Sequence, residues 1–373
     1  MKIAIDAVGI DATGGGRSAT LNLLERLVEL GAEHQYLIIL SVPEPSLQAS
    51  NVKQLIAPTK GRMQVRLWAQ ITWRNLFIRE KVDLVHHIKC QALWGSPCPS
   101  IVTVYDLTVL AHPEFFPRVD VLYWQSYQRL VLPRADHVIA ISHMTARDLR
   151  HFYGIPEKKL SVIYPRISSA FRPPDAEAIA RVRSKYQLPE HYLLHVGSIS
   201  PKKNLAVLVQ AYRELKSSGR YAGDLVLVGR NYSSSADPAL AELLAGANDI
   251  PVHMTGAVPQ EDLSAIMGAA DCFVFPSLHE GFGMVSVEAM ACGTPVVAAH
   301  GDAIAEATGD AGVLVDDPTN PEAFATAVYQ ITSNPTYRQI LIGRGLDQAK
   351  RYNTDQPVYE TLGLYERLVR RVV

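Results

Sequence analysis

The sequence predicts an α/β protein of two domains, each built on a doubly wound parallel sheet. Short apolar runs of strand length alternate with helical segments along the chain, which is typical of parallel sheets with helices on both faces. A proline-rich segment interrupts this alternation near the middle of the chain, and the pattern then starts again. The length of 373 residues also suits two domains better than one hydrophobic core.

The first half of the chain supplies the strands of one predicted sheet. They lie at Lys2–Asp6, Tyr36–Leu40, Leu84–His87, Ile101–Val104 and His137–Ile141. Helical segments such as Thr20–Leu30 and Val65–Arg79 separate most of them. The interruption is Tyr164–Pro174, which holds three prolines and two serines and is therefore predicted to be a linker.

The second half repeats the pattern. Its predicted strands lie at Tyr192–Val196, Asp224–Val228, Val252–Thr255, Cys272–Phe275 and Pro295–Ala298. Its predicted helices lie at Leu205–Ser217, Glu261–Ala269 and Met284–Cys292. We predict an N-terminal domain over residues 1–170, a second domain over 171–357, and a C-terminal helix over 358–373 that packs back on the first domain. Two such domains should face each other across a cleft between the carboxyl ends of their sheets, where α/β proteins bind ligands.

Composition and charge restrict the class of partner. The chain is 48% hydrophobic and 20% charged, as in ordinary globular proteins. Its formal net charge of −1 argues against nucleic acid as a partner. Residues 1–170 carry 19 basic and 14 acidic side chains, whereas residues 171–373 carry 17 and 23. This asymmetry either draws an anionic substrate or membrane surface to the first domain or is ordinary scatter.

The cysteines and the N-terminus indicate a cellular compartment. Cys90, Cys98, Cys272 and Cys292 show no metal-ligand spacing, and two of them lie in strongly apolar segments, which predicts buried thiols in a reducing cytosol. The N-terminus is predicted to be a strand rather than a signal peptide, and no apolar run approaches the roughly 18 residues of a membrane span. We expect a cytoplasmic protein, soluble or held peripherally at the inner membrane face, with no metal and no cofactor.

Residues 271–299 are the most informative segment, predicted to be a buried strand, a glycine-containing turn, a short helix and a second buried strand. Glu280 falls in the turn and Glu288 about one turn into the helix, so both carboxylates lie near the end of a parallel strand. Each carboxylate can accept hydrogen bonds from two adjacent sugar hydroxyls. The N–H groups around Gly283–Val285 form a free helix N-terminus that favours a phosphate. The segment therefore suits a nucleotide-sugar; ordinary surface carboxylates are the alternative.

Two more loops follow the first strands of the two domains. Gly197–Asn204 places Lys202 and Lys203 before a helix N-terminus, an unfavourable position for cations that a bound diphosphate would compensate. A solvated loop is the alternative interpretation. Asp11–Arg17 holds three consecutive glycines, which let the backbone approach an anion closely or simply form a structural turn. Neither loop carries a dinucleotide fingerprint, which argues against a dehydrogenase.

Taken together, these segments resemble the retaining glycosyltransferases of family 4, also called group 1, which have the GT-B fold of two Rossmann-like domains. The Glu280–Glu288 segment resembles the E-x7-E signature of that family, and Gly197–Asn204 resembles its G-x-x-x-P-[RK]-K-N stretch. Val138–Leu149 is similar to a strand-helix segment of the family, and Thr255–Leu263 is similar to its base-binding loop. The resemblance covers nearly the whole chain.

The resemblance implies a role for each matching residue. Glu280 would contact the hydroxyls of the donor sugar, Glu288 would hold the ribose, and Lys203 with Lys202 would neutralise the diphosphate. The remaining donor-site residues would be Phe282 and Gly283 beside the sugar, Gly15, Gly16, Met284 and Val285 at the phosphates, and Val258 and Gln260 around the base. Because Gln260 can accept only through its carbonyl, where an acidic residue is common, a preference for guanine is weakened.

The implied reaction moves a hexose, of the mannose or glucose class, from a nucleotide-diphosphate sugar to a glycan or lipid-linked acceptor. One departure concerns its chemistry. Val104–Pro117 resembles the H-D-L…P-E-[FY]-x-P block of the family, but Tyr105 replaces the histidine. With a reference pKa of about 10, a tyrosine cannot act as a base near neutral pH. Either Tyr105 positions the sugar, or Asp106 or His112 takes over part of the role.

A protein base is not required if the leaving diphosphate accepts the acceptor's proton, as such retaining enzymes are thought to do. The protein must then stabilise charge on the diphosphate, which two lysines and a helix N-terminus can do without a metal. Our candidate catalytic residues are Glu280, Lys203, Tyr105 and Asp106. The alternatives are a nucleotide-sugar epimerase or phosphorylase of the same fold, and a catalytically silent nucleotide-sugar-binding protein. The silent protein stays an alternative because Tyr105 stands where the family has a histidine.

Two features bear on the acceptor. Residues Arg62–Lys81 mix arginines with aromatic residues such as Trp73 and Phe77, which fits either a helix lying on an anionic membrane or an amphipathic packing helix. His86 and His87 end a buried strand and are expected to line the acceptor side of the cleft. The oligomeric state is not indicated by the sequence.

Overall fold

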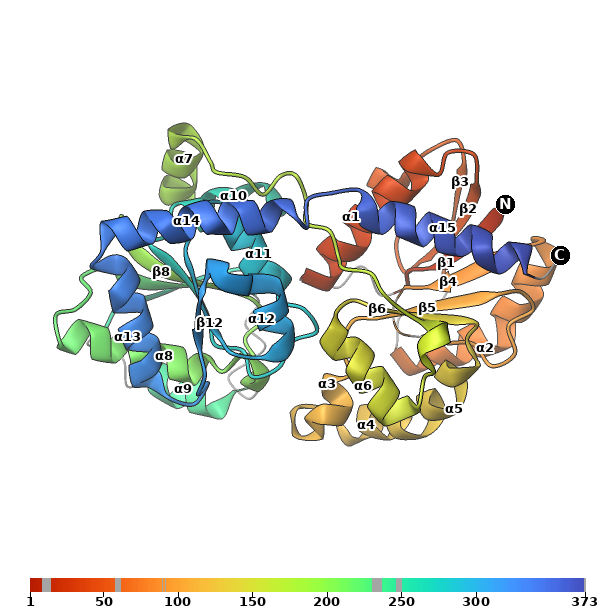
Figure 1. The fold of residues 1–373 in the computed structure, drawn as a ribbon, viewed down its shortest axis with the longest axis horizontal. Coiled ribbons are helices and arrows are strands. Elements are labelled where there is room, and N and C mark those ends of the chain that lie inside the picture. The colour runs from red at the N-terminus through yellow and green to blue at the C-terminus, as the bar shows by residue number, and fades with distance from the viewer. Residues whose placement is uncertain are drawn as a thin grey trace. The chain divides into compact units, whose positions relative to one another are not determined.

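The computed structural model describes residues 1–8, 15–57, 62–88, 90, 92–229, 237–245 and 250–371. The chain divides into two compact units, Met1–Arg166 with Thr354–Val373 as unit 1, and Ile167–Asn353 as unit 2. Each unit is a parallel sheet flanked by helices (Figure 1), so the predicted α/β class with two doubly wound sheets is confirmed.

Unit 1 contains a sheet of strand order β3-β2-β1-β4-β5-β6-β7 in which the paired strands are parallel. Its strands are β1 (Lys2–Asp6), β2 (Gln35–Leu40), β3 (Val52–Ile56), β4 (Leu84–His87), β5 (Ser100–Val104), β6 (His137–Ala140) and β7 (Leu160–Val162). Its helices are α1 (Gly15–Leu30), α2 (Arg62–Arg79), α3 (Thr108–Ala111), α4 (Arg118–Tyr123), α5 (Arg129–Val131), α6 (His143–Tyr153) and α15 (Gln356–Arg370). The strand order reverses at β1 and β4, which makes this pair the topological switch point.

Unit 2 contains a sheet of strand order β10-β9-β8-β11-β12-β13, again parallel throughout its pairs. Its strands are β8 (Tyr192–Val196), β9 (Asp224–Val228), β10 (Val252–Gly256), β11 (Cys272–Phe275), β12 (Val296–Ala299) and β13 (Val313–Val315). Its helices are α7 (Ala176–Tyr186), α8 (Leu205–Ser217), α9 (Pro238–Ala245), α10 (Gln260–Gly268), α11 (Met284–Ala291), α12 (Asp302–Thr308), α13 (Pro321–Thr332) and α14 (Pro335–Lys350). Here the order reverses at β8 and β11, so these two strands should carry the ligand site of the unit.

Local sequence explains why the elements begin and end where they do. The central strands β4, β8 and β11 are fully buried, as expected for parallel strands covered on both faces, and β11 is apolar along its whole length. Helix α6 begins after Ser142, whose hydroxyl accepts from the N–H of Thr145 at 3.0 Å. It ends at Gly154, where φ is +64° and the chain turns left-handed.

The C-terminal helix α15 belongs to unit 1 and lies beside α1 (Figure 1). Val358 and Leu364 join the apolar core that also contains Ile3 of β1. The phenol of Tyr365 lies 2.6 Å from Nδ1 of His86. Burial of this apolar face, rather than helix propensity, accounts for the return of the chain to the first sheet.

Two features of unit 1 bear on what the sequence suggested for the acceptor side. Trp73 and Phe77 of α2 are buried in the core, so this helix packs through its aromatic residues and does not offer them to a membrane. His86 and His87 are both 0% exposed, so the expectation that they line an acceptor cleft is wrong. Both ring nitrogens of His86 have internal partners, since the ring bonds Tyr365 and also Thr103 at 2.7 Å, and Nδ1 of His87 lies 3.2 Å from the Asp6 carboxylate.

Other features of the described residues concern membranes, metals and thiols. None of the described helices combines the length and apolar character that a membrane span requires. Within the same part of the chain, no three His, Cys, Asp or Glu side chains gather as a metal site would require. Cys272 and Cys292 are free thiols and buried, which confirms the prediction made from their apolar segments.

Candidate functional site

The candidate donor site lies at the carboxyl edge of the unit 2 sheet, at its switch point. The loop after β8 carries the lysines, and the loop after β11 leads to Glu280. Backbone contacts join the two loops, because the N–H of Leu278 donates to the carbonyl of Lys202 at 2.9 Å. The amide of Asn204 donates to the carbonyl of Pro276 at 3.2 Å. Two segments about 80 residues apart in sequence therefore form one surface, as the topology predicts.

Lys203 and Glu280 form an ion pair within this surface. Their side chains are 10% and 13% exposed, so both charges are largely removed from solvent. Burial alone would raise the pKa of Glu280, but the ammonium groups of Lys203 and Lys202 outweigh it and hold that pKa below its usual range. Glu280 is therefore a carboxylate at neutral pH, able to accept hydrogen bonds from hydroxyls.

The turn after β11 leads into the N-terminus of α11. Gly283 has a φ of +98°, a conformation that side chains disfavour, and it directs the chain into the helix. No side chain among the described residues caps this helix, and the N–H groups of Met284 and Val285 lie too near its start to have an intrahelical acceptor. Phe282 is 2% exposed and packs edge-on against Tyr352 at 5.1 Å, which holds the turn in place. The arrangement suits an anion.

Glu288 lies in the second turn of α11 and is 3% exposed. Burial raises the pKa of its carboxyl group to about 8. Without a ligand, Glu288 is therefore mostly protonated at neutral pH, in contrast to Glu280. The two carboxyl groups of the motif differ in charge because Glu280 has lysine neighbours and Glu288 does not.

The predicted base-site residues lie on the same edge of the sheet. Val258 follows the carboxyl end of β10, and Gln260 is the exposed first residue of α10. The strand order places β10 two positions from β8.

The predicted residues of unit 1 lie at the carboxyl edge of its own sheet. Gly15 and Gly16 form the start of α1, whereas the preceding Gly14 lies outside the described residues. Tyr105 and Asp106 follow β5.

Tyr105 is directed into unit 1. Its hydroxyl lies 2.8 Å from Oγ1 of Thr20, a fully buried residue of α1. The hydroxyl of Thr145 donates to the Tyr105 carbonyl at 3.3 Å. Burial raises the pKa of Tyr105, and the hydrogen bond with Thr20 offsets this only in part. The tyrosine therefore links β5 to the helix that starts at the glycine loop, and it stays protonated at neutral pH.

Asp106 and His112 have local partners. A carboxylate oxygen of Asp106 accepts from the N–H of Thr108 at 3.1 Å. Nδ1 of His112 lies 3.1 Å from the Glu114 carboxylate. Neither geometry by itself assigns a catalytic role.

His195 is a buried neighbour of the site that the sequence analysis did not select. It lies in β8, is 1% exposed, and its Nδ1 is 3.0 Å from the carbonyl of Val274. Its Nε2 is buried without a hydrogen-bond partner among the described residues. The available signal was a histidine in an otherwise apolar strand, two residues before Gly197.

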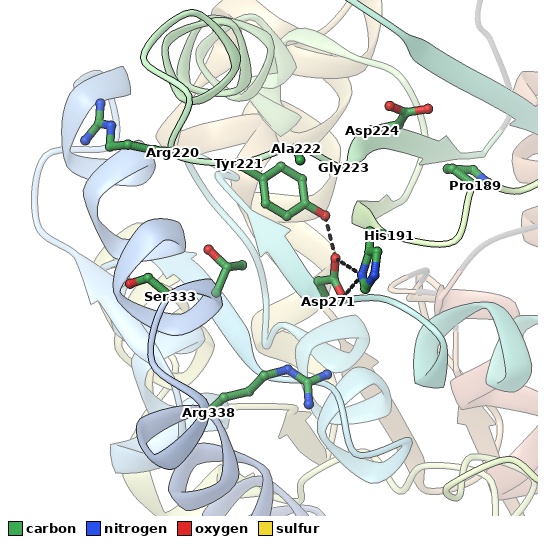
Figure 2. Close-up of a pocket in the computed structure, with 11 residues that line it drawn as sticks. Pro189, His191, Arg220, Tyr221, Ala222, Gly223, Asp224, Asp271, Ser333 and Arg338 are labelled. Atoms are coloured by element: carbon green, nitrogen blue, oxygen red, sulfur yellow. Dashed lines mark hydrogen bonds and ion pairs between the residues drawn. The ribbon is translucent and has the colours of Figure 1, made fainter.

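A cavity of about 520 Å³ lies at the opposite, amino edge of the unit 2 sheet. Figure 2 shows the cluster on its wall, in which the Tyr221 hydroxyl donates to Asp271 at 2.7 Å and His191 lies 3.2 Å from the same carboxylate. His191 and Asp271 directly precede β8 and β11, and Tyr221 lies three residues before β9, so all three are at the amino ends of strands. The cavity is therefore separate from the lysine and glutamate loops, and its size does not identify the donor site.

Comparisons with known proteins show which family the chain resembles. A family model described as Glycosyl transferases group 1 matches residues 190–334, and one described as Glycosyltransferase Family 4 matches residues 13–170. The chain is 31% identical over 389 residues to the O-antigen chain mannosyltransferase B of Escherichia coli, covering 99% of this chain and 100% of that protein.

Two solved structures share its fold. Sucrose-phosphate synthase from Thermosynechococcus elongatus has a TM-score of 0.82 at 20% identity and covers 100% of both chains. The Anabaena protein HepE in complex with UDP-glucose has a TM-score of 0.76 at 18% identity and covers 97% of this chain and 99% of its own.

Proposed function

This chain belongs to the group 1 glycosyltransferases, and we propose that it transfers a hexose, of the mannose or glucose class, with retention of the anomeric configuration. Its fold is GT-B, and as a glycosyltransferase it uses a nucleotide-sugar donor. The proposed acceptor is a hydroxyl of a glycan or lipid-linked saccharide. The similarity to an O-antigen chain mannosyltransferase favours mannose over glucose and supports a place in polysaccharide biosynthesis.

The Lys203–Glu280 pair carries the proposal for donor binding. The low pKa of Glu280 supports a carboxylate that accepts hydrogen bonds from the hexose hydroxyls. When the donor binds, its diphosphate replaces this carboxylate as the anionic partner of Lys203. Glu288 takes the ribose hydroxyls in the same way. The N–H groups of Met284 and Val285 add backbone donors at the phosphates.

The proposed chemistry uses no protein base and no metal. Tyr105 stays protonated and hydrogen-bonded to Thr20, which supports a structural role at the glycine loop rather than proton transfer. The leaving diphosphate would take the proton of the attacking hydroxyl as the bond to the anomeric carbon breaks. The positive charges of Lys202 and Lys203 then stabilise the charge that develops on that diphosphate.

The acceptor is proposed to reach the enzyme from a membrane surface through a face of unit 1. This face carries exposed apolar and basic side chains on the segment from α4 to α5 and on a neighbouring loop. They are Val119, Leu122, Leu130, Trp94, Arg118, Arg129 and Arg134. The guanidinium of Arg134 lies 4.5 Å above the Trp94 ring, which joins the loop to the helical segment. Apolar groups flanked by arginines fit an anionic lipid surface.

A donor screen tests the proposed function. Thermal unfolding is measured with UDP-, GDP-, ADP- and dTDP-hexoses, and one donor class should stabilise the protein by about 2.7 kcal/mol at a hundredfold excess over Kd. Replacing Glu288 with Ala should weaken binding of the free nucleotide and of the donor alike. Replacing Glu280 with Ala should spare the free nucleotide and impair transfer. If no donor stabilises the wild-type protein, the proposal fails.

A further inference from the structure

His195 presents a buried hydrogen-bond acceptor for which the described part of the chain supplies no partner. A buried polar atom left unpaired costs free energy, so each one calls for an explanation. Because Nδ1 faces the Val274 carbonyl, the proton must reside on Nδ1, and Nε2 carries a lone pair. That Nε2 has no hydrogen-bond partner among the residues that the structure describes.

The imidazole is held in this orientation and kept neutral. Its ring stacks on Phe273 and Phe275, with centroids 6.3 Å and 6.1 Å away. Burial lowers the pKa of His195 to about 4; the Lys203 charge acts in the same direction, and the hydrogen bond to Val274 and the Glu280 charge oppose it only in part. The ring is therefore an uncharged acceptor over the whole range in which the enzyme is expected to work.

The lone pair lies beside the lysine of the donor site. A Cβ atom built on Gly197 would lie 3.1 Å from Nε2 of His195 and 3.6 Å from Cε of Lys203. The two side chains therefore contact the same small volume above the glycine. The Lys203 ammonium also lies 5.0 Å from the centroid of the Phe275 ring on which His195 stacks.

We propose that His195 is a positioning residue for Lys203, accepting a hydrogen bond from its ammonium group once the donor has displaced Glu280. The inference rests on the proposed function, because it assigns Lys203 to the diphosphate. A neutral acceptor suits this position for an electrostatic reason. A carboxylate partner such as Glu280 cancels most of the lysine charge, whereas an imidazole orients the ammonium and leaves its full charge directed at the phosphates.

The test replaces His195 with Phe, which keeps the stacked ring and removes the acceptor, and with Gln, whose amide oxygen can return an acceptor near the Nε2 position. We expect His195→Phe to lower kcat roughly tenfold or more and to weaken nucleoside diphosphate binding, while free nucleoside binds as before. His195→Gln should recover a substantial part of both losses. A loosened fold would instead weaken nucleoside and nucleoside diphosphate alike.

A double-mutant cycle with Lys203→Ala provides a second measurement that does not depend on the Phe variant being fully stable. In the Lys203→Ala background, His195→Gln and His195→Phe should have equal activity, because the lysine that used the acceptor is gone. Wild-type kinetics in His195→Phe, or equal losses in Phe and Gln in the presence of Lys203, would overturn the inference. Such results would leave the donor screen intact, whereas a wild-type protein that binds no nucleotide-sugar would refute the proposed function itself.

Discussion

Nucleotide-sugar binding should depend on pH through Glu288. The unliganded carboxyl group has a pKa of about 8 because it is buried without a positive neighbour. Two ribose hydroxyls donate best to a carboxylate, so the donor should bind the ionised form. The perturbation that isolates this effect is Glu288→Gln, which keeps the size of the side chain and removes its titration.

The size of the effect follows from the pKa. At pH 7 about one molecule in ten has Glu288 ionised, and each pH unit below 8 adds about 1.4 kcal/mol to the cost of ionisation. As the pH rises from 5 to 7, the Kd for a nucleotide-sugar should therefore fall about tenfold per pH unit, and it should level off above pH 8. Close to one proton should be released per donor bound at pH 7.

The same pKa shift has a stability consequence of defined sign. A carboxyl group whose pKa is raised in the folded state contributes fully to the free energy of unfolding at pH values below its unfolded pKa of 4.5. That contribution is lost as the pH rises through the folded-state pKa of about 8. In the absence of donor, Glu288→Gln should therefore be more stable than the wild type at pH 9, by up to about 5 kcal/mol.

Isothermal titration calorimetry in buffers of different ionisation enthalpy measures both the affinity and the proton release. A nucleotide-sugar is the better probe because its diphosphate diester does not titrate in this range, unlike a free nucleoside diphosphate. Wild type should show the pH slope and the released proton, and Glu288→Gln should show neither. An identical pH slope in the two proteins would refute the reasoning.

Three further predictions concern other parts of the molecule. Lys203→Ala should destabilise the protein by about 3 kcal/mol in urea unfolding, because it leaves the buried Glu280 carboxylate unpaired. Adding Glu280→Gln to this variant should recover part of the loss, and additive losses would contradict the coupling between the two side chains. Tyr105→Phe removes the hydrogen bond to Thr20, so it should cost about 1 kcal/mol of stability, and it should leave the pH dependence of kcat unchanged. If a pKa in the pH profile of kcat disappeared in this variant, Tyr105 would take part in proton transfer after all. The wild-type protein should float with phosphatidylglycerol vesicles, and Leu122→Glu should abolish that binding. The control Gln125→Glu adds the same charge at another exposed position of the segment from α4 to α5 and should retain most of the binding. Equal loss in both variants, or absence of wild-type binding, would rule out the proposed membrane face of unit 1.

The strands and the order of domains could be read from the sequence because parallel strands buried on both faces leave continuous apolar runs. The predicted strand at Tyr192–Val196 coincides with β8, and the predicted helix at Leu205–Ser217 coincides with α8. Short or half-buried elements were missed. Strand β3 has two adjacent polar residues and no fully buried one at the sheet edge, and the segment from α4 to α5 exposes apolar side chains, so neither leaves a clear pattern of burial.

The parts of the candidate site that could be predicted are those that depend on local sequence. Glu280 and Glu288 share one turn and helix, so their neighbourhood follows from spacing. The contact of Lys203 with Glu280 depends instead on pairing between β8 and β11, and the different charge states of the two glutamates depend on that contact. The partners of Tyr105 and His195 also come from other strands and helices, which a linear pattern does not specify.

The stereochemistry of transfer tests the central claim most directly. Proton NMR can follow the first sugar product released from the stabilising donor, with water or a simple sugar hydroxyl as the acceptor, before spontaneous anomer exchange. A site made of Glu280, the Lys203 cation and the α11 N-terminus, with no protein base, predicts that the product first formed has the anomeric configuration of the donor. An inverted product would contradict the account, because it would require a base on the opposite face of the sugar.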